Sequence, residues 1–132
     1  MRAFREAVEA GDLDAVEALL ADDVVFTSPA VFKPYPGKPI TAAILRAVFR
    51  VFEDFRYVRE IGDADGADHA LVFAARVGDR ELTGCDFLHV GEDGLIDEFT
   101  VMIRPLSGLQ ALAEAMGAQF EQIAKDAEAR SV

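Results

Sequence analysis

The chain has 132 residues, 52% of them hydrophobic and 28% charged, a composition typical of one globular domain spanning residues 1–132. A formal net charge of −11 argues against binding to nucleic acid or to anionic membranes, because both require an excess of Lys and Arg. No apolar run reaches the roughly 18 residues of a membrane span, and the charged N-terminal sequence is unlike a signal peptide, so we expect a cytoplasmic protein.

The first part of the chain predicts two helices, a strand and a loop. Residues 2–21 have apolar side chains at helical spacing, interrupted by Gly11-Asp12, where Gly suits a helix end and Asp the next N-cap. Residues 24–28 are mainly β-formers and predict a short strand. The segment 29–39 contains four prolines, which predicts a stiff loop that is either the rim of a cleft or a simple connector.

Residues 41–55 predict a helix with a broad apolar surface. Its apolar side chains form two adjacent rows at i, i+4 spacing, which are Ile44, Val48 and Phe52, and Leu45 and Phe49. A surface this wide needs a sheet to pack against. Residues 55–61 then alternate in polarity as a strand does, and end in the turn-forming residues 62–66.

A hairpin is predicted around Gly78-Asp79. The strand 69–77 precedes this two-residue loop, and glycine in its first position is typical of a type II′ turn. The register pairs Arg76 with Glu81, which have opposite charges, and Leu71 with Asp86. A slip of one residue would turn Arg76 to the face that carries Asp86, and the sequence leaves that alternative open.

A second hairpin is predicted over residues 81–105, with its turn at residues 91–94. Pairing Val90 with Leu95 places Asp97 opposite Leu88 and Asp86 opposite Phe99. The face of Asp86 is otherwise apolar, with Leu71, Phe73, Ala75, Leu82, Gly84, Phe99, Val101 and Ile103. A lone carboxylate in such surroundings is rare, so Asp86 is either a functional acid with a raised pKa or a structural group satisfied by a hydroxyl or amide.

The opposite face of the same strands is also apolar, and carries Cys85, Phe87, Thr100 and Met102. Helices can cover only one face of the sheet, so we expect a second copy of the chain to cover the other in a homodimer. Cys85 is the only cysteine, which excludes an intramolecular disulfide and a cysteine-based metal site, and we expect a buried structural thiol.

The last predicted element is a helix after Pro105, capped by Ser107, with one apolar stripe formed by Leu109, Leu112, Met116, Phe120 and Ile123. The order of elements is therefore helices, strand, helix, four strands and helix. This order predicts an α+β fold with the helices on one face of a mostly antiparallel sheet.

The chain resembles the SnoaL-like branch of the nuclear transport factor 2-like (NTF2-like) superfamily, nearly end to end. Three segments carry the resemblance: FREAVEAGDLDAVEALLADDVVFTSP, PYPGKPI and GCDFLHVGEDGLIDEFTVMIRP. It implies a cone in which a strongly curved, mostly antiparallel sheet wraps around helices and encloses an apolar pocket. Members include ketosteroid isomerases, epoxide hydrolases, polyketide cyclases and non-catalytic modules, so the fold alone does not decide the function.

Comparison with ketosteroid isomerases is the most informative. Those enzymes need a carboxylate base, and a tyrosine and a protonated aspartic acid as hydrogen-bond donors. The resemblance places the donor aspartic acid on Asp86, the base on Ser28 and the donor tyrosine on Phe4. A serine without a neighbouring base does not abstract a carbon-bound proton at neutral pH, so efficient isomerase chemistry of this type is not expected.

Two other activities of the family make different demands on the residues. The resemblance places the water-activating residues of epoxide hydrolases on Arg76, Gly78 and Val101, and only the arginine is of the required type, so this activity is rejected. Polyketide cyclases use a pocket Asp or His as acid or base on an already acidic carbon. Asp86 is suited to that role, and Asp97 is expected near the mouth of the pocket.

We therefore expect the pocket to bind a small hydrophobic, oxygenated molecule, with Asp86 as proton donor or anchor. Cofactor-independent chemistry of the isomerase, cyclase or lyase type is one hypothesis, and a non-catalytic dimerisation or ligand-binding module is the alternative. The expected ligand-binding residues are Phe4, Phe26, Ser28, Phe73, Phe99 and Val101. No spacing suits a metal site, and His69 and His89 are expected at the surface or an interface.

Overall fold

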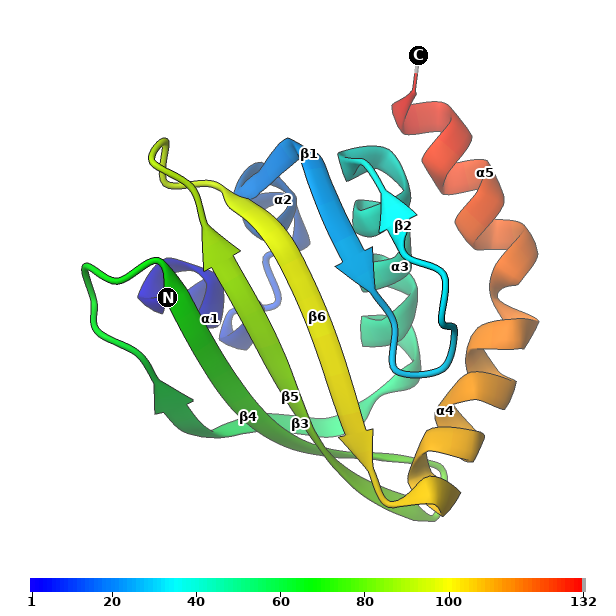
Figure 1. The fold of residues 1–132 in the computed structure, drawn as a ribbon. Helices are drawn as coiled ribbons and strands as arrows, with labels where there is room; N and C mark the ends of the chain where they lie inside the picture. The colour runs from blue at the N-terminus through cyan, green and yellow to red at the C-terminus, as the bar shows by residue number, and fades with distance from the viewer. Residues whose placement is uncertain (132) are drawn as a thin grey trace.

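The computed structural model describes residues 1–131, and combines a six-stranded sheet with five helices (Figure 1). The elements are α1 (Arg2–Glu9), α2 (Leu13–Ala18), β1 (Leu20–Thr27), β2 (Tyr35–Pro36), α3 (Lys38–Val51), β3 (Glu53–Ile61), β4 (Asp68–Val77), β5 (Arg80–Val90), β6 (Ile96–Arg104), α4 (Leu106–Ala118) and α5 (Phe120–Arg130).

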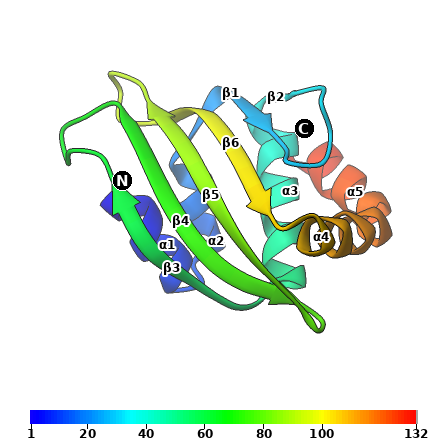
Figure 2. The same cartoon turned by 60° about the horizontal axis from the view of Figure 1, so that its bottom comes forward.

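The strand order is β2-β1-β6-β5-β4-β3, and every neighbouring pair is antiparallel except β1 and β6. The sheet is strongly curved, α1 to α3 lie against its concave face, and α4 and α5 run alongside α3 (Figures 1 and 2). The predicted α+β class with a mostly antiparallel curved sheet is confirmed. Among the residues described, no helix is long and apolar enough to cross a membrane.

The two N-terminal helices form where they were predicted. Asp12 caps α2, because its side chain accepts a hydrogen bond from the backbone N–H of Ala15 at 3.1 Å. Strand β1 begins at Leu20 rather than at Val24, because Leu20 already pairs with Ile96 of β6 before the pairing of β1 with β6 shifts register. Both Leu20 and Val24 are fully buried in the core.

Helix α3 is displaced towards the N-terminus relative to the prediction. It begins at Lys38, where Pro39 suits the first helical turn, and it ends at Val51 because Phe52 is extended. Phe52 and Phe55 therefore leave the helix and pack on Phe73 of β4, with ring centroids 5.6 and 5.0 Å away. Tertiary packing of these rings, rather than helical periodicity, places them on the apolar side.

The two hairpins differ in how well their registers were predicted. The β4–β5 register is as predicted, with Arg76 opposite Glu81 and Leu71 opposite Asp86, so Arg76 does not share the face of Asp86. The β5–β6 register was wrong by two residues: Asp86 lies opposite Val101, not Phe99. A five-residue turn, closed by the N–H of Gly91 donating to the carbonyl of Leu95, and a register shift after His89 account for the difference.

An error of two residues keeps every side chain on its predicted face, so Asp86 still faces the helices. The exception is Asp97, which was expected on that face. The β-bulge leaves Asp97 without a partner in the β5–β6 register, and its carboxylate lies beside His89 instead of Leu88.

The single C-terminal helix that was predicted is divided at Gln119 into two helices, α4 and α5. The prediction that Ser107 caps its start was wrong, because the N-cap of α4 is Pro105 and no side chain caps it. Leu112 and Ile123 are buried as the apolar stripe predicts, whereas Phe120 is 67% exposed.

His69 was expected at the surface or an interface, and that expectation was wrong. Its ring is buried, with Nε2 2.7 Å from the carbonyl of Gly66 and Nδ1 3.0 Å from the amino group of Met1. Because a carbonyl only accepts, Nε2 donates and Nδ1 accepts. The histidine thus joins the start of α1 to the loop before β4.

Candidate ligand-binding cavity

A cavity of about 400 Å³ lies between the concave face of the sheet, α3 and the α4–α5 pair. The sheet contributes Phe26, Phe73, Asp86, Phe99, Val101 and Ile103; α3 contributes Ile40, Ile44, Leu45, Val48 and Phe49; α4 and α5 contribute Leu112, Met116, Phe120 and Ile123. Val31 and Phe120 line it and are also well exposed to solvent, so they mark its mouth.

The wall of the cavity is almost entirely apolar. Among the described residues that line it, Asp86 has the only carboxylate, and none has a cationic side chain. The other polar lining side chains are the hydroxyls of Ser28 and Tyr35. Such a surface suits the body of a hydrophobic molecule, with Asp86 as its main polar contact.

Asp86 is held in this wall by its place in the middle of the sheet. It lies on β5 between Leu71 of β4 and Val101 of β6, and it is 6% exposed. The hydroxyl of Tyr57 donates a hydrogen bond to its Oδ2 at 3.0 Å. Burial raises the pKa of Asp86 to about 7, while the Tyr57 hydrogen bond acts in the opposite direction by stabilising the carboxylate.

Tyr57 was missed by the sequence reasoning. It lies on β3, opposite Phe73 of β4, and is buried. Burial and the neighbouring Asp86 raise the pKa of Tyr57, so its hydroxyl keeps its proton. The alternation of residues 55–61 places Phe55 and Tyr57 on one face, and this signal could have drawn attention to a tyrosine facing the carboxylate.

Ser28, at the position of the base in the resemblance, is part of the loop that forms the rim. Its Oγ accepts hydrogen bonds from the N–H groups of Ala30 at 3.0 Å and Val31 at 3.3 Å. Both lone pairs of the hydroxyl are thus in use, which fixes the turn and leaves Ser28 only a proton to donate. The serine is therefore unsuited to act as a base.

The structure brings together most of the residues that the sequence singled out. Phe26, Ser28, Phe73, Phe99 and Val101 all line the cavity together with Asp86. Phe4 does not line it. Its ring is fully buried in the core and contacts Phe99 edge-on, with centroids 5.5 Å apart.

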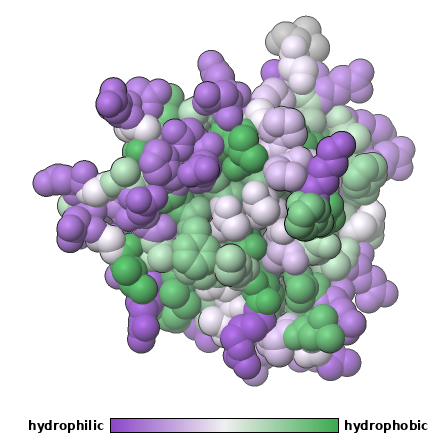
Figure 3. Space-filling model, viewed as in Figure 1, coloured by the Kyte–Doolittle hydropathy of each residue, from purple (hydrophilic) through white to green (hydrophobic). Residues whose placement is uncertain are grey.

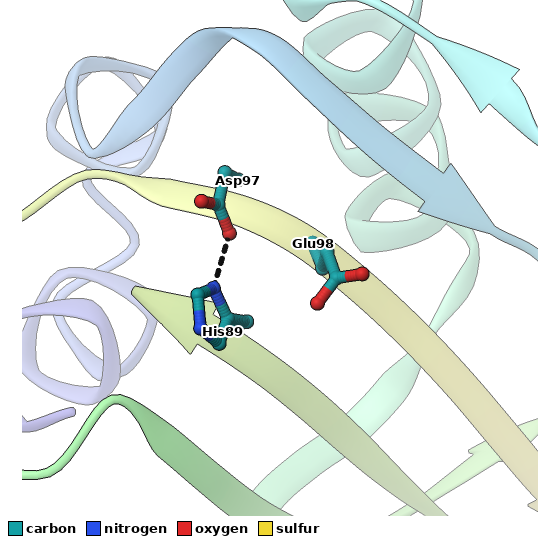
Figure 4. Close-up of side chains that lie close together, drawn as sticks. All are labelled: His89, Asp97 and Glu98. Atoms are coloured by element: carbon teal, nitrogen blue, oxygen red, sulfur yellow. Dashed lines mark hydrogen bonds and ion pairs between the residues drawn. The ribbon is translucent and has the colours of Figure 1, made fainter. Parts of the chain in front are cut away.

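A separate polar cluster lies outside the cavity at the ends of β5 and β6 (Figure 4). His89 Nδ1 is 2.6 Å from Asp97 Oδ1, and Glu98 brings a second carboxylate within 4.8 Å. The hydrogen bond and charge of Asp97 raise the pKa of His89, which favours its imidazolium form. Among the residues described, these three side chains could hold a metal ion only after His89 loses its proton. Asp97 does not reach the cavity mouth, contrary to expectation.

Arg76 is also outside the cavity. Its guanidinium contacts Asp54 at 2.8 Å and Glu53 at 3.2 Å, both at the start of β3. An arginine engaged in this way at the surface cannot help to activate a water molecule in the cavity.

Comparisons with known proteins agree with this architecture. The family model described as SnoaL-like domain matches residues 1–99. A steroid delta-isomerase from Pseudomonas aeruginosa is 45% identical, with 92% of this chain and 89% of that chain covered and a TM-score of 0.85. An uncharacterised bacterial protein with a cystatin-like fold from Silicibacter pomeroyi is 38% identical, with 98% and 91% covered and a TM-score of 0.88.

A candidate polyketide cyclase from Pseudomonas putida shares the fold at 22% identity, with 82% of this chain and 90% of that chain covered and a TM-score of 0.66. None of the curated proteins matches the chain. The fold is that of the NTF2-like proteins. The chain belongs to the SnoaL-like domain family.

Proposed function

We propose that the chain binds a small, neutral, hydrophobic molecule in the cavity, and that the Asp86 carboxyl donates a hydrogen bond to an oxygen of that molecule. The observation that carries the proposal is the one buried carboxyl that the described residues place in an almost entirely apolar wall. The volume of about 400 Å³ falls in the range of small-molecule sites.

The charge of the wall supports a neutral ligand. Transfer of an ionised group into an apolar site is costly unless an opposite charge meets it. No described lining residue offers a cation, and the chain has a net charge of −11. A ketone, lactone or similar oxygen accepts a hydrogen bond without bringing a charge.

The same geometry supports hydrogen-bond donation rather than strong base chemistry at Asp86. The relative from Pseudomonas aeruginosa is named a steroid delta-isomerase. Such an isomerisation relocates a double bond by moving a proton, and this requires a base. Ser28 accepts two backbone hydrogen bonds and cannot take that role. Cofactor-independent isomerase, cyclase or lyase chemistry is therefore proposed only for substrates whose C–H bond is acidic enough to lose its proton to the carboxylate form of Asp86, and ligand binding without turnover is the alternative.

The binding proposal is tested with two bicyclic probes of similar shape, 1-tetralone and tetralin, which differ by one carbonyl group. Affinities are measured by chemical-shift titration of the labelled protein at pH 6. A neutral hydrogen bond contributes about 0.5–1.5 kcal/mol, so 1-tetralone should bind about two- to tenfold more tightly. Asp86→Leu should remove the difference and Asp86→Asn, which can still donate, should keep it. Equal affinities for both probes in the wild type contradict the proposal.

The absence of a base is tested with 5-androstene-3,17-dione as a probe substrate. We expect binding without rapid formation of the conjugated enone, which is followed by its ultraviolet absorbance. Rapid isomerisation that Ser28→Ala abolishes would show that Ser28 acts as a base and would refute this part of the proposal.

We also propose that a second copy of the chain covers the convex face of the sheet. Phe87 is 41% exposed and Met102 59% exposed there, beside Cys85 and Thr100. Figure 3 views this face, and apolar side chains gather over the middle of the sheet with hydrophilic ones towards its edge. Light scattering after gel filtration should give a dimer that Met102→Lys converts to a monomer. Phe120→Lys, on α5 at the mouth of the cavity and so on the concave side of the sheet, serves as the control, and a monomeric wild type contradicts the proposal.

A further inference from the structure

Asp86 has one side-chain partner among the described residues, the hydroxyl of Tyr57. The Tyr57 oxygen lies 3.0 Å from Oδ2 of Asp86, and both residues are 6% exposed. Tyr57 does not line the cavity, whereas Asp86 does. The tyrosine therefore contacts the carboxyl from behind, on the side away from a bound ligand.

Tyr57 is itself held on two sides. The ring of Phe55 meets it edge-on with centroids 5.0 Å apart, and the guanidinium of Arg5 lies 5.9 Å from its centroid. Arg5 is fixed in turn by Glu60, at 3.2 Å. A ring clamped between a strand neighbour and a helix side chain keeps its hydroxyl directed at one carboxyl oxygen.

The chemistry of the contact decides where the acid proton resides. Burial keeps the phenol protonated, so Tyr57 donates and Oδ2 accepts. In a neutral carboxyl the proton then sits on Oδ1, the oxygen that Tyr57 leaves free.

We propose that Tyr57 is a positioning residue of the ligand site: by donating to Oδ2 it places the Asp86 proton on Oδ1 and presents it to the ligand oxygen. This inference rests on the proposed function, in which Asp86 donates to the ligand. The role of Tyr57 is indirect, because the tyrosine contacts the Asp86 carboxyl and not the ligand.

The test is the titration of the Asp86 carboxyl, followed by ¹³C NMR in the ligand-free protein. The Tyr57 hydrogen bond lowers the pKa of Asp86 against the larger effect of burial, so Tyr57→Phe should raise the pKa above the wild-type value of about 7. A merely structural role predicts the opposite sign, because loosened packing would admit water and lower the pKa. Tyr35→Phe is the matched control, since Tyr35 is the other tyrosine of the chain and lines the same cavity without contacting Asp86.

A second measurement keeps the test valid if Tyr57→Phe does not fold. In the Tyr35→Phe background, 3-fluorotyrosine enters only at position 57, where its more acidic hydroxyl is a stronger donor. The pKa of Asp86 should then fall. An unchanged pKa in both experiments, or a fall in Tyr57→Phe, overturns the assignment of Tyr57.

The binding readout uses 1-tetralone at pH 6, where Tyr57→Phe should weaken binding about two- to tenfold, the effect of one misdirected hydrogen bond. Tetralin should bind Tyr57→Phe as it binds the wild type. A wild-type Asp86 that titrates near its ordinary value, about 4, would refute the proposed function itself. A raised wild-type pKa that Tyr57→Phe leaves unchanged would refute only the role of Tyr57.

Discussion

Replacing Asp86 with asparagine removes the one carboxylate that the described residues place in the cavity wall, and it keeps the shape of the side chain. The amide oxygen can accept the hydrogen bond of Tyr57 as Oδ2 does, and the amide nitrogen can donate into the cavity as a protonated Oδ1 does. Asp86→Asn is therefore a close mimic of the neutral acid. The variant should differ from the wild type only at pH values where the wild-type carboxyl ionises.

The size of the expected stability difference follows from the pKa of Asp86 in the folded and unfolded states. In the unfolded chain Asp86 loses its proton near pH 4, whereas in the folded protein burial raises its pKa to about 7. Between these values the folded state binds more protons than the unfolded state, so stability falls as the pH rises and becomes constant above about pH 7. Three pH units at 1.36 kcal/mol each correspond to about 4 kcal/mol.

The assay is urea unfolding of wild type and Asp86→Asn at intervals between pH 3.5 and 8, followed by circular dichroism. The two proteins should have about equal free energies of unfolding at the lowest pH. By pH 8 the free energy of unfolding of the variant should exceed that of the wild type by about 4 kcal/mol. The difference between the two curves cancels the titration of all other groups, including His89. A difference that does not change with pH, or one that favours the wild type as the pH rises, refutes a buried neutral Asp86.

Three further predictions concern packing and the surface ion pair. A methyl group added by Gly84→Ala would overlap the ring of Phe73, so we expect a loss of about 1–3 kcal/mol in urea unfolding and an altered cavity wall. Gly117→Ala, where nothing lies within 4 Å of the added methyl, should instead stabilise α4 by about 0.5–1 kcal/mol, and a loss there would contradict the packing described. The imidazole of His89, titrated by NMR, should show a raised pKa that Asp97→Asn lowers, with stability lost as the pH rises through the folded value. An unchanged pKa of His89 in Asp97→Asn would contradict the ion pair.

Local turn chemistry explains why one hairpin register was predictable and the other was not. Gly78-Asp79 forms a two-residue turn, and its geometry fixes the pairing of Leu71 with Asp86 fifteen residues along the chain. In the β5–β6 hairpin the register is set jointly by a longer turn and a β-bulge. Neither feature has a short sequence motif that would predict it. The facing of Asp86 was nevertheless correct, because a shift of two residues matches the two-residue period of a strand.

The contact of Tyr57 with Asp86 could not be predicted from local sequence patterns, because it depends on pairing between strands that are distant in the sequence. Strand β3 meets β4 through two register shifts, on either side of Arg56 and Tyr57, so the position of the tyrosine relative to Asp86 could not be counted along the chain. Phe52 and Phe55 illustrate the same limit. Their spacing fits α3, but packing on Phe73 draws them out of the helix.

Ser28 and Phe4, which depart from the ketosteroid isomerase pattern, are both consistent with a site that keeps Asp86 protonated. A base at the position of Ser28 would be a carboxylate in the same apolar wall as Asp86, and two carboxyls there would compete for one proton. With Ser28 engaged by Ala30 and Val31, no such competition exists and Asp86 can remain neutral at moderate pH. Phe4 fills the core where the resemblance places a donor tyrosine, and Tyr57 reaches the carboxyl from β3.

Below the pKa of Asp86 a wall arranged in this way donates a hydrogen bond, and no second carboxyl among the described residues lines it to accept a proton. The effect of Asp86→Asn on ligand binding should then depend on pH. At pH 6 the variant should bind 1-tetralone about as tightly as the wild type, because the amide still donates. Above pH 8 it should bind more tightly than the wild type, because the wild-type carboxylate has lost the proton that it would share with the carbonyl oxygen. Chemical-shift titrations at pH 6 and pH 8.5 measure both affinities, and a wild type whose affinity is independent of pH would show that Asp86 does not donate to the ligand.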